Sequence, residues 1–427
     1  MAAPSPRTLR IAVTAWAAIT FAALLSSFMA FRPVRDALAL DGKTEDIPWL
    51  FTATFVGAIA ISPVWSRMLA RRPKRLVVPQ AFHAFALCAL VFAALLYSRW
   101  QPVGVGRAFY IWSSVFNLFV VSVFWSLLVD LIGPVWAKRL YGPISAGGTI
   151  GTIAGPFFAR VVVEAFDVAG VLVLCAILLE IAVVGAWRVR LAGEALSHEE
   201  GVGADEPVAS TPWEGFHRVV RSRYLLAIVG YVLCTAIAAT FVYLEQASII
   251  KEGFSTREAR AEFFSELDLW IALATFGVQT VIAGPLLRWI GAGLVLCLLP
   301  LAQGAAISAL AIAPTVTVLA IVQIVSRSFT HGLTRPAREL LFTVVSREDK
   351  YHAKNVIDLA GYRFGDVVGG WAKTGVTALG GGAATVMIAA APLVAVWIGL
   401  AIALGIAFRH RASDASRPES PPSGHSA

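Results

Sequence analysis

The chain has 427 residues, of which 58% are hydrophobic and 15% are charged, and its mean hydropathy is +0.73. Soluble globular domains have a lower apolar share, arranged in short periodic patches, so this composition excludes an ordinary soluble domain and indicates a polytopic membrane protein. The formal net charge of +8 does not indicate a nucleic-acid partner, because the basic residues follow the membrane topology.

Twelve apolar runs are long enough to cross a bilayer as helices. A hydrocarbon core about 30 Å thick needs about 20 helical residues, and the alternating segments of a membrane barrel do not appear in the sequence. The runs cover 11–39, 47–69, 76–97, 107–131, 140–163, 167–190, 221–244, 268–290, 293–313, 315–337, 354–379 and 384–408. We therefore predict an all-α membrane protein with twelve transmembrane helices in two six-helix halves.

The distribution of Lys and Arg predicts the orientation of these helices. Of the 35 basic residues, 23 fall in segments expected on the side of the N-terminus, seven on the opposite side and five within the runs. Segments rich in Lys and Arg face the cytoplasm. Both termini are therefore expected in the cytoplasm.

A polar segment divides the chain into halves of similar length. Residues 191–217 lose the apolar pattern and are rich in acidic residues, Gly and Pro, which is typical of a linker. The expected segments are an N-terminal half at 1–190, a cytoplasmic linker at 191–217, a C-terminal half at 218–409 and a disordered tail at 410–427. Ala137-Lys138 recurs as Ala353-Lys354, half a chain length further on, which favours an internal duplication.

The end of the first run carries three charges at membrane depth. Arg32 and Asp36 are one helical turn apart, and Arg35 lies on the same side. Pro33 removes an intrahelical hydrogen bond between them. Charges within a membrane are costly and usually face a bundle interior or an aqueous cavity. These residues are therefore candidates for substrate binding or gating. The alternative is an Arg32–Asp36 ion pair that serves only the structure.

Small residues recur in the fifth run. Gly147, Gly151 and Gly155 follow one another at intervals of four residues, which lets a neighbouring backbone approach closely. The segment from Gly151 to Pro156 also resembles the glycine-proline motif of the fifth helix in antiporters of the major facilitator superfamily. Helix packing alone is the alternative interpretation.

Other polar residues give weaker signals. His83 is expected to be a packing residue, and Glu180 a buried acid without a partner nearby in the sequence. The four cysteines and seven histidines lack the spacing of a metal site, so no metal, cofactor or disulfide is predicted. Residues 246–268 are rich in charge and are expected to form the longest outer loop, with an amphipathic surface helix.

The most informative stretch is 326–373, where ionisable residues lie within or beside apolar runs. A regular helix advances by about 100° per residue, which places one polar stripe on a single face: Arg327, His331, Thr334, Arg335 and Arg338. A second stripe follows at steps of three, four or seven residues: Asp358, Tyr362, Gly365, Asp366, Gly369 and Lys373. Two polar stripes on adjacent apolar helices predict the wall of a transport pathway.

The segment at 338–370, RELLFTVVSREDKYHAKNVIDLAGYRFGDVVGG, resembles the ATP/ADP translocase (nucleotide transporter) family of bacteria and plastids. The shared pattern is a basic residue with glutamate, then Glu-Asp-Lys, Ala-Lys, Ile-Asp, Phe-Gly and Gly-Gly. In this chain the matching residues are Arg338-Glu339, Glu348-Asp349-Lys350, Ala353-Lys354, Ile357-Asp358, Phe364-Gly365 and Gly369-Gly370. Val34-Arg35-Asp36 is similar to that family's Leu-Arg-Asp near helix 1.

The resemblance implies a major-facilitator-like fold that exchanges nucleotides by alternating access. Cations near the expected cavity suit phosphate or carboxylate oxygens, and the candidates for substrate binding are Arg32, Arg35, Arg327 and Lys373. The candidates for charge balance or proton coupling are Asp36, Asp358 and Asp366. The candidates for a cytoplasmic gate between the tenth and eleventh helices are Arg338, Glu339, Glu348, Asp349, Lys350 and Lys354.

The chain departs from the family pattern after Gly365. Where the family follows this glycine with lysine, the chain has Asp366, and Lys373 comes two turns later. The sequence therefore predicts a secondary transporter of a small organic anion in the bacterial inner membrane, with a nucleotide as one candidate. The alternative is proton-coupled transport of another solute, such as a drug-like compound, a peptide fragment or a sugar derivative, with Asp366 as the proton carrier.

A membrane-embedded enzyme or a receptor is disfavoured. The sequence contains no metal-ligand cluster, no nucleophile with a base, no phosphate-binding glycine loop and no folded soluble domain. The expected partners are the small anionic substrate and the lipid bilayer, without nucleic acid. The chain is expected to act as a monomer.

Overall fold

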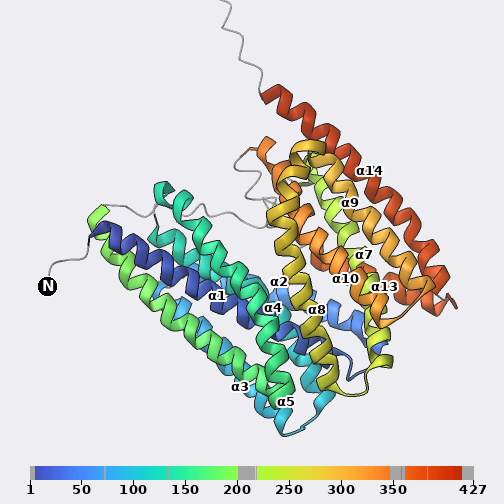
Figure 1. The fold of residues 1–427 in the computed structure, drawn as a ribbon, viewed down its shortest axis with the longest axis horizontal. Coiled ribbons are helices and arrows are strands. Elements are labelled where there is room, and N and C mark those ends of the chain that lie inside the picture. Colours follow the sequence, from blue (N-terminus) through green and yellow to red (C-terminus); the bar gives the residue numbers. More distant parts are fainter. Residues whose placement is uncertain are drawn as a thin grey trace, which may run out of the picture. The chain divides into compact units, whose positions relative to one another are not determined.

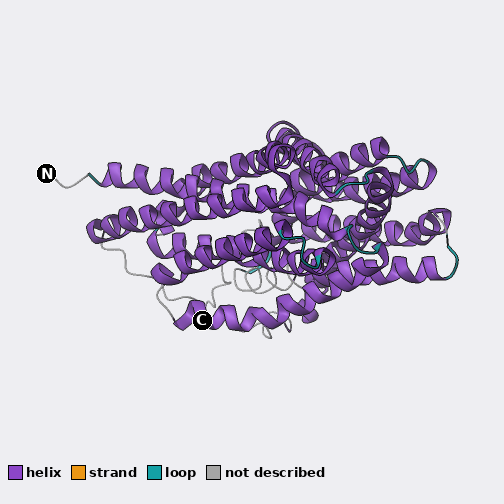
Figure 2. Cartoon of the chain, turned by 90° about the horizontal axis from the view of Figure 1, so that it is seen from below, coloured by secondary structure: helices purple, strands orange, loops and turns teal. Residues whose placement is uncertain are grey.

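Helices make up almost all of the computed structural model, and no strand occurs in the part of the chain that it describes (Figure 2). The described residues are 5–71, 74–132, 134–200, 217, 219–346, 357, 361–381 and 383–415. The prediction of an all-α protein is confirmed over these residues.

The helices of the first half begin and end as follows: α1 at Pro6–Ala39, the 3-10 helix η1 at Thr44–Asp46, α2 at Ile47–Arg71, α3 at Lys74–Tyr97, α4 at Pro102–Leu131 and α5 at Pro134–Glu200. The second half contains α7 at Arg223–Gly253, α8 at Arg257–Gly277, the π-helix η2 at Val278–Ile282, α9 at Ala283–Ile312, α10 at Val316–Phe329, the π-helix η3 at Thr330–Thr334, α11 at Arg335–Leu341, the 3-10 helix η4 at Phe342–Val344, α13 at Tyr362–Ala378 and α14 at Ala383–Ala415.

Nine ranges of the described residues are long and apolar enough to cross a membrane. Two of them, Arg139–Leu196 and Arg257–Ile312, are each broken by a residue with positive φ, Asp167 at 74° and Gly291 at 77°. Each therefore holds two helical passages, and the nine ranges contain eleven of the twelve predicted runs. The remaining run, 354–379, is described only in part, mainly as α13, which is short and charged. The count of twelve stays a prediction.

The described residues form two compact units. Unit 1 takes its residues from 1–208, 243–274 and 315–324, and unit 2 takes its residues from 209–242, 275–314 and 325–427. The ends of α7 and α8 nearest to the loop that joins them therefore belong to unit 1, together with α1 to α5. The division into halves at 191–217 stays a prediction.

Within unit 1, α1 lies alongside α5 because glycines let their backbones meet (Figure 1). A Cβ atom added to Gly147 or Gly151 would lie 2.3 Å from the carbonyl oxygen of Ala18 or Ala22, respectively. Gly155 approaches Ser26 in the same way, at 2.5 Å. The glycine stripe therefore serves helix packing.

Within unit 2, α13 packs on α7 through a matching stripe. Added Cβ atoms on Gly361, Gly365 and Gly369 would lie 3.0, 2.4 and 2.9 Å from side-chain atoms of α7. The three contacts pair Gly361 with Val232, Gly365 with Ala236 and Gly369 with Thr240. Each residue in these contacts has a counterpart in unit 1, always at the same separation in the sequence, which is about half the length of the chain. Gly365, for example, corresponds to Gly151, and Ala236 corresponds to Ala22. The packing of α1 on α5 therefore recurs in the second half of the sequence.

Several helices extend beyond their expected limits. α7 continues to Gly253 and α8 begins at Arg257, so the expected long outer loop is wrong, and only residues 254–256 separate the two helices. α5 continues into the predicted linker, to Glu200, and α14 continues to Ala415. A helix can continue beyond its apolar run when side chains near its end pack against neighbouring elements.

Candidate functional site

Asp36, near the end of α1 in unit 1, accepts hydrogen bonds from two other residues. The Arg35 Nε and Nη2 atoms donate to Asp36 Oδ1 at 2.9 and 2.7 Å. The Tyr243 hydroxyl of α7 donates to the same oxygen at 3.1 Å. The guanidinium of Arg35 also lies 5.1 Å from the centre of the Tyr110 ring on α4. Asp36 therefore pairs with Arg35, and the proposed alternative of an Arg32–Asp36 pair is wrong.

Arg32 has a different partner, on α8. Its Nε lies 3.7 Å from Asp268 Oδ2, and the Asp268 side chain is only 6% exposed. The Arg32 side chain keeps 24% of its surface exposed. A buried carboxylate needs a compensating cation, so each of the two arginines in the first run is matched by an acid. Sequence reasoning missed Asp268, which lies at the boundary between the expected outer loop and an apolar run.

Next to this pair, a group of polar contacts joins the end of α1 to α7 and α8; we call it the Asp41 lock. Arg257 Nη2 lies 2.6 Å from Asp41 Oδ2, and Arg260 Nη1 lies 3.7 Å from Asp41 Oδ1. Lys251 Nζ donates to the carbonyl oxygen of Gly42 at 2.6 Å. The side chains of Asp41, Arg257 and Arg260 are only 13%, 20% and 10% exposed. The lock consists of Asp41, Gly42, Lys251, Arg257 and Arg260.

In unit 2, the first predicted stripe is interrupted by a π-helix. Residues 330–334 form η3, which contacts the second π-helix, η2: a Cβ atom added to Gly332 would lie 2.6 Å from Val278 Cγ1. Gln279 of η2 donates to the carbonyl oxygen of His331 at 3.1 Å. Segments of π-helix occur frequently at functional sites.

The extra residue of a π-turn rotates everything that follows it, so the single regular stripe is wrong. Arg335 is exposed, whereas Arg338 is only 4% exposed. Arg338 donates from Nη1 to the Tyr362 hydroxyl at 3.0 Å, which joins α11 to α13. Glu339 follows it on α11 and is partly buried. Their role in a gate stays a prediction.

The second stripe is described in part. Asp366 of α13 accepts a hydrogen bond from the Thr240 hydroxyl at 3.3 Å, and its other oxygen lies 3.7 Å from Arg363 Nη1. Lys373 of α13 and Arg327 of α10 are partly buried. Five predicted site residues lie outside the described residues: Glu348, Asp349, Lys350, Lys354 and Asp358. The structure brings Arg32, Arg35 and Asp36 together within unit 1, and it places Arg327, Asp366 and Lys373 in unit 2.

His83 and Glu180 form a pair that the sequence did not predict. His83 Nδ1 lies 2.9 Å from Glu180 Oε1, and the two side chains are 55% and 48% exposed. The prediction that Glu180 is buried is therefore wrong, and its partner is far away in the sequence. Within the described ranges, no three His, Cys, Asp or Glu side chains come together as a metal site.

Part of the chain is similar to proteins that carry adenine nucleotides. It is 26% identical over 219 residues to ADP,ATP carrier protein 1 of Chlamydia trachomatis serovar D, and the match covers 46% of this chain and 42% of that carrier. ADP,ATP carrier protein 1 of Chlamydia muridarum is also 26% identical over 219 residues, with 46% and 41% covered. The chain therefore spans less than half the length of these relatives.

Solved structures of transporters share the fold over nearly the whole chain. The nucleoside transporter NupG has a TM-score of 0.59 at 13% identity, covering 95% of this chain and 99% of that one. A bacterial homologue of the iron transporter ferroportin, in an inward-facing state, has a TM-score of 0.58 at 12% identity, with 94% and 98% covered. At this identity the likeness establishes the fold alone.

The family model of the Major Facilitator Superfamily matches residues 11–351, which is most of the chain. The helical fold, the charged residues at membrane depth and the transporter neighbours agree with this match. The predicted resemblance to major facilitator transporters and to ADP/ATP carriers is confirmed. The chain is thus a multi-pass membrane transport protein, not an enzyme, and it belongs to the major facilitator superfamily.

Proposed function

We propose that the protein exchanges small phosphorylated organic anions, such as nucleotides, across the bacterial inner membrane by alternating access. The observation that carries this proposal is Arg32, a partly exposed guanidinium at membrane depth whose nearest carboxylate oxygen lies 3.7 Å away. A direct charge-assisted hydrogen bond is shorter, about 2.7 to 2.9 Å. A phosphate oxygen that approaches to this distance competes favourably with Asp268 for Arg32.

The surroundings of Arg32 suit an oxyanion. The planar fork of arginine binds phosphate or carboxylate oxygens in pairs, and Arg35 already contacts a carboxylate through two nitrogens. Arg327 and Lys373 stay candidates for substrate binding on the sequence alone. The match to the Chlamydia ADP,ATP carriers supports a nucleotide as the first substrate to test.

Opening of the pathway on the side of the Asp41 lock requires the lock to break. Its contacts join the end of α1, in the first half of the sequence, to α7 and α8, in the second half. By the positive-inside pattern this is the outer side, with both termini in the cytoplasm. The protein acts as a monomer in this proposal.

The test is flux into proteoliposomes that contain the purified protein. We expect saturable uptake of labelled ADP or ATP that increases when unlabelled nucleotide is present inside. Arg32→Gln is expected to raise the KM of this uptake at least about tenfold, whereas Arg107→Gln, which breaks an exposed pair with Asp46, leaves the uptake within about twofold of the parent. The absence of saturable flux for nucleotides and for other phosphorylated anions contradicts the proposal.

A second candidate is proton-coupled transport of another solute, and Asp366 favours it. Asp366 replaces the family's lysine, and its side chain remains 29% exposed. In this case Asp366→Asn abolishes flux driven by a pH gradient but preserves equilibrium exchange. If Asp366→Asn leaves the gradient-driven flux unchanged, the proton-coupled candidate is eliminated.

A further inference from the structure

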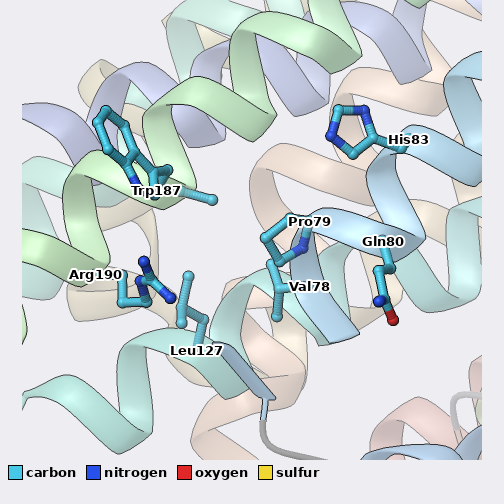
Figure 3. A pocket seen from close by; sticks show the side chains of 8 residues that line it. Val78, Pro79, Gln80, His83, Leu127, Trp187 and Arg190 are labelled. Carbon is cyan, nitrogen blue, oxygen red and sulfur yellow. The ribbon is translucent and has the colours of Figure 1, made fainter. Parts of the chain in front are cut away.

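A cavity of about 250 Å³ lies between α3, α4 and α5 of unit 1 (Figure 3). Its lining is mostly apolar and includes a few polar side chains. The lining residues are Val78, Pro79, Gln80, His83, Leu127, Ala186, Trp187 and Arg190. At about 30 Å³ per water-sized group, it has room for about eight methylene groups. Pockets that enclose a whole small molecule are larger, about 300 to 1,000 Å³. The cavity therefore suits part of an acyl chain better than a transported solute.

The cavity lies near one surface of the membrane. Asp167, with its positive φ, marks the turn between the two helical passages of α5. Arg190 follows it by 23 residues, which at a rise of about 1.5 Å per residue is about 35 Å of helix. Because the hydrocarbon core is about 30 Å thick, Arg190 reaches the headgroup region opposite to Asp167.

The surfaces on both sides of the cavity face lipid. On α5, Ile181 and Val184 are 44% and 52% exposed, and on α3, Leu87 is 63% exposed. Large apolar side chains exposed on a membrane helix contact acyl chains. Trp187 belongs to this surface and also lines the cavity (Figure 3). The cavity is thus continuous with the lipid-facing surface of the helices.

An aromatic and basic cluster next to the cavity marks the headgroup level. The Arg188 guanidinium lies 5.2 Å from the ring centre of Trp187 and 5.6 Å from that of Trp16. Tryptophan rings and basic side chains collect where the acyl chains meet the headgroups. The position of this cluster agrees with the depth of Arg190 in the membrane, which was derived above from the length of the helix.

Arg190 has an unused donor. Its Nε is buried and makes no hydrogen bond within the described part of the chain. The nearest acid, Glu194, lies 3.9 Å from this nitrogen, which is too far for a hydrogen bond. A buried donor without an acceptor indicates a missing partner. The Arg190 side chain is 26% exposed, so a rotation of this side chain would bring the donor to an oxygen at the mouth of the cavity.

We propose that this cavity binds one anionic phospholipid, with its phosphate on Arg190 and one acyl chain between Val78, Leu127 and Trp187. Arg188 and Arg190 carry two positive charges, and Glu194 neutralises only one of them. A headgroup with net negative charge therefore binds more tightly than a zwitterionic one. The site lies apart from Arg32 and Arg35, and its occupancy does not depend on which solute is transported.

The test uses the purified full-length protein in a neutral detergent, with the thermal unfolding midpoint as the readout. A ligand that binds only the folded state raises this midpoint. We expect phosphatidylglycerol to raise it by several degrees, phosphatidylcholine with the same acyl chains to raise it much less, and inorganic phosphate to leave it unchanged. An equal shift with both lipids, or a shift with phosphate alone, overturns the proposal.

Two variants locate the site, and a third serves as the control. Arg190→Gln is expected to need about ten times more phosphatidylglycerol for the same shift, the effect of losing one charge-assisted hydrogen bond. Ala186→Leu fills the cavity without a change of charge and is expected to weaken the response similarly. Arg7→Gln removes an exposed charge at the start of α1 and responds like the parent. If Arg190→Gln or Ala186→Leu also responds like the parent, the proposal is wrong.

Discussion

Arg257 holds Asp41 through two nitrogens: Nε and Nη2 lie 2.8 and 2.6 Å from the same carboxylate oxygen, Oδ2. This pair ties α8 to the end of α1, and Arg260 strengthens it from the other side of the carboxylate. Asp41→Asn leaves both guanidinium groups without an anion in a largely buried place, which is costly. We expect amide hydrogen exchange at 40–42 and 254–260 to accelerate about tenfold, which corresponds to about 1.4 kcal/mol.

Asp46→Asn is the matched control for the Asp41 lock. Asp46 pairs with Arg107, but the two side chains are 35% and 47% exposed, and both belong to the first half of the sequence. Exposed pairs contribute little. Equal acceleration at 254–260 in Asp41→Asn and Asp46→Asn would refute the special role of the lock.

The contact of Gly151 with Ala22 predicts a position-specific effect of side-chain volume. A Cβ atom at Gly151 would lie 2.3 Å from the Ala22 carbonyl oxygen, so Gly151→Leu must push α5 away from α1. Overpacking of this kind costs about 1 to 3 kcal/mol or more. We expect the thermal midpoint in detergent to fall by at least about 3 °C.

Gly142, on the same helix, has no atom within 4 Å of an added Cβ and is exposed. Gly142→Leu is therefore expected to leave the midpoint unchanged or to raise it, because leucine favours a helix over glycine. Gly365 occupies the position of Gly151 in the repeated packing, so Gly365→Leu should behave like Gly151→Leu, with Gly375→Leu as its control. A stable Gly365→Leu variant would show that the repeated packing is not energetically equivalent.

The fold was largely predictable from the sequence because its signals are local. Long apolar runs, the short breaks between successive runs and glycines four residues apart can each be recognised within one segment of the sequence. The charged residues at 246–268 led to the wrong prediction of a long outer loop, because polar stretches are typical of loops. Their partners at the end of α1 are far away in the sequence. Contacts with these partners stabilise the segment as the adjoining ends of α7 and α8.

The sequence predicted most of the charged residues of the candidate site, but it did not predict which of them pair with one another. The sequence identified Arg32, Arg35 and Asp36, but a spacing of one turn favoured the wrong pair. Asp268 enters the site from a distant helix, and no periodicity in α1 identifies it. The prediction of the first polar stripe was wrong for another reason. It assumed a regular α-helix, but the π-turn of η3 changes the direction of the side chains that follow it.

The Arg32–Asp268 pair predicts an effect on substrate affinity that depends on the proposed function. Asp268→Asn removes the carboxylate that competes with an anionic substrate for Arg32, so the KM for that substrate is expected to fall about tenfold, or about 1.4 kcal/mol. In the Arg32→Gln background, Asp268→Asn should have no such effect, because the two residues act as one unit. The measurement is uptake at varied substrate concentration. An equal change of KM in both backgrounds rules out this competition.

Gln279 predicts how the two π-helices of unit 2 support each other. Its side-chain amide donates to the His331 carbonyl oxygen, which links η2 to η3 at 3.1 Å. Gln279→Leu keeps the size of the side chain but removes this donor, at a cost of about 1 kcal/mol or less in an exposed place. Amide exchange at 330–335 is therefore expected to accelerate about threefold. Thr280→Val is the control, since the Thr280 hydroxyl donates only to its own helix, at Phe276 and Gly277. If the two variants accelerate exchange at 330–335 equally, the link between η2 and η3 does not stabilise the π-turn.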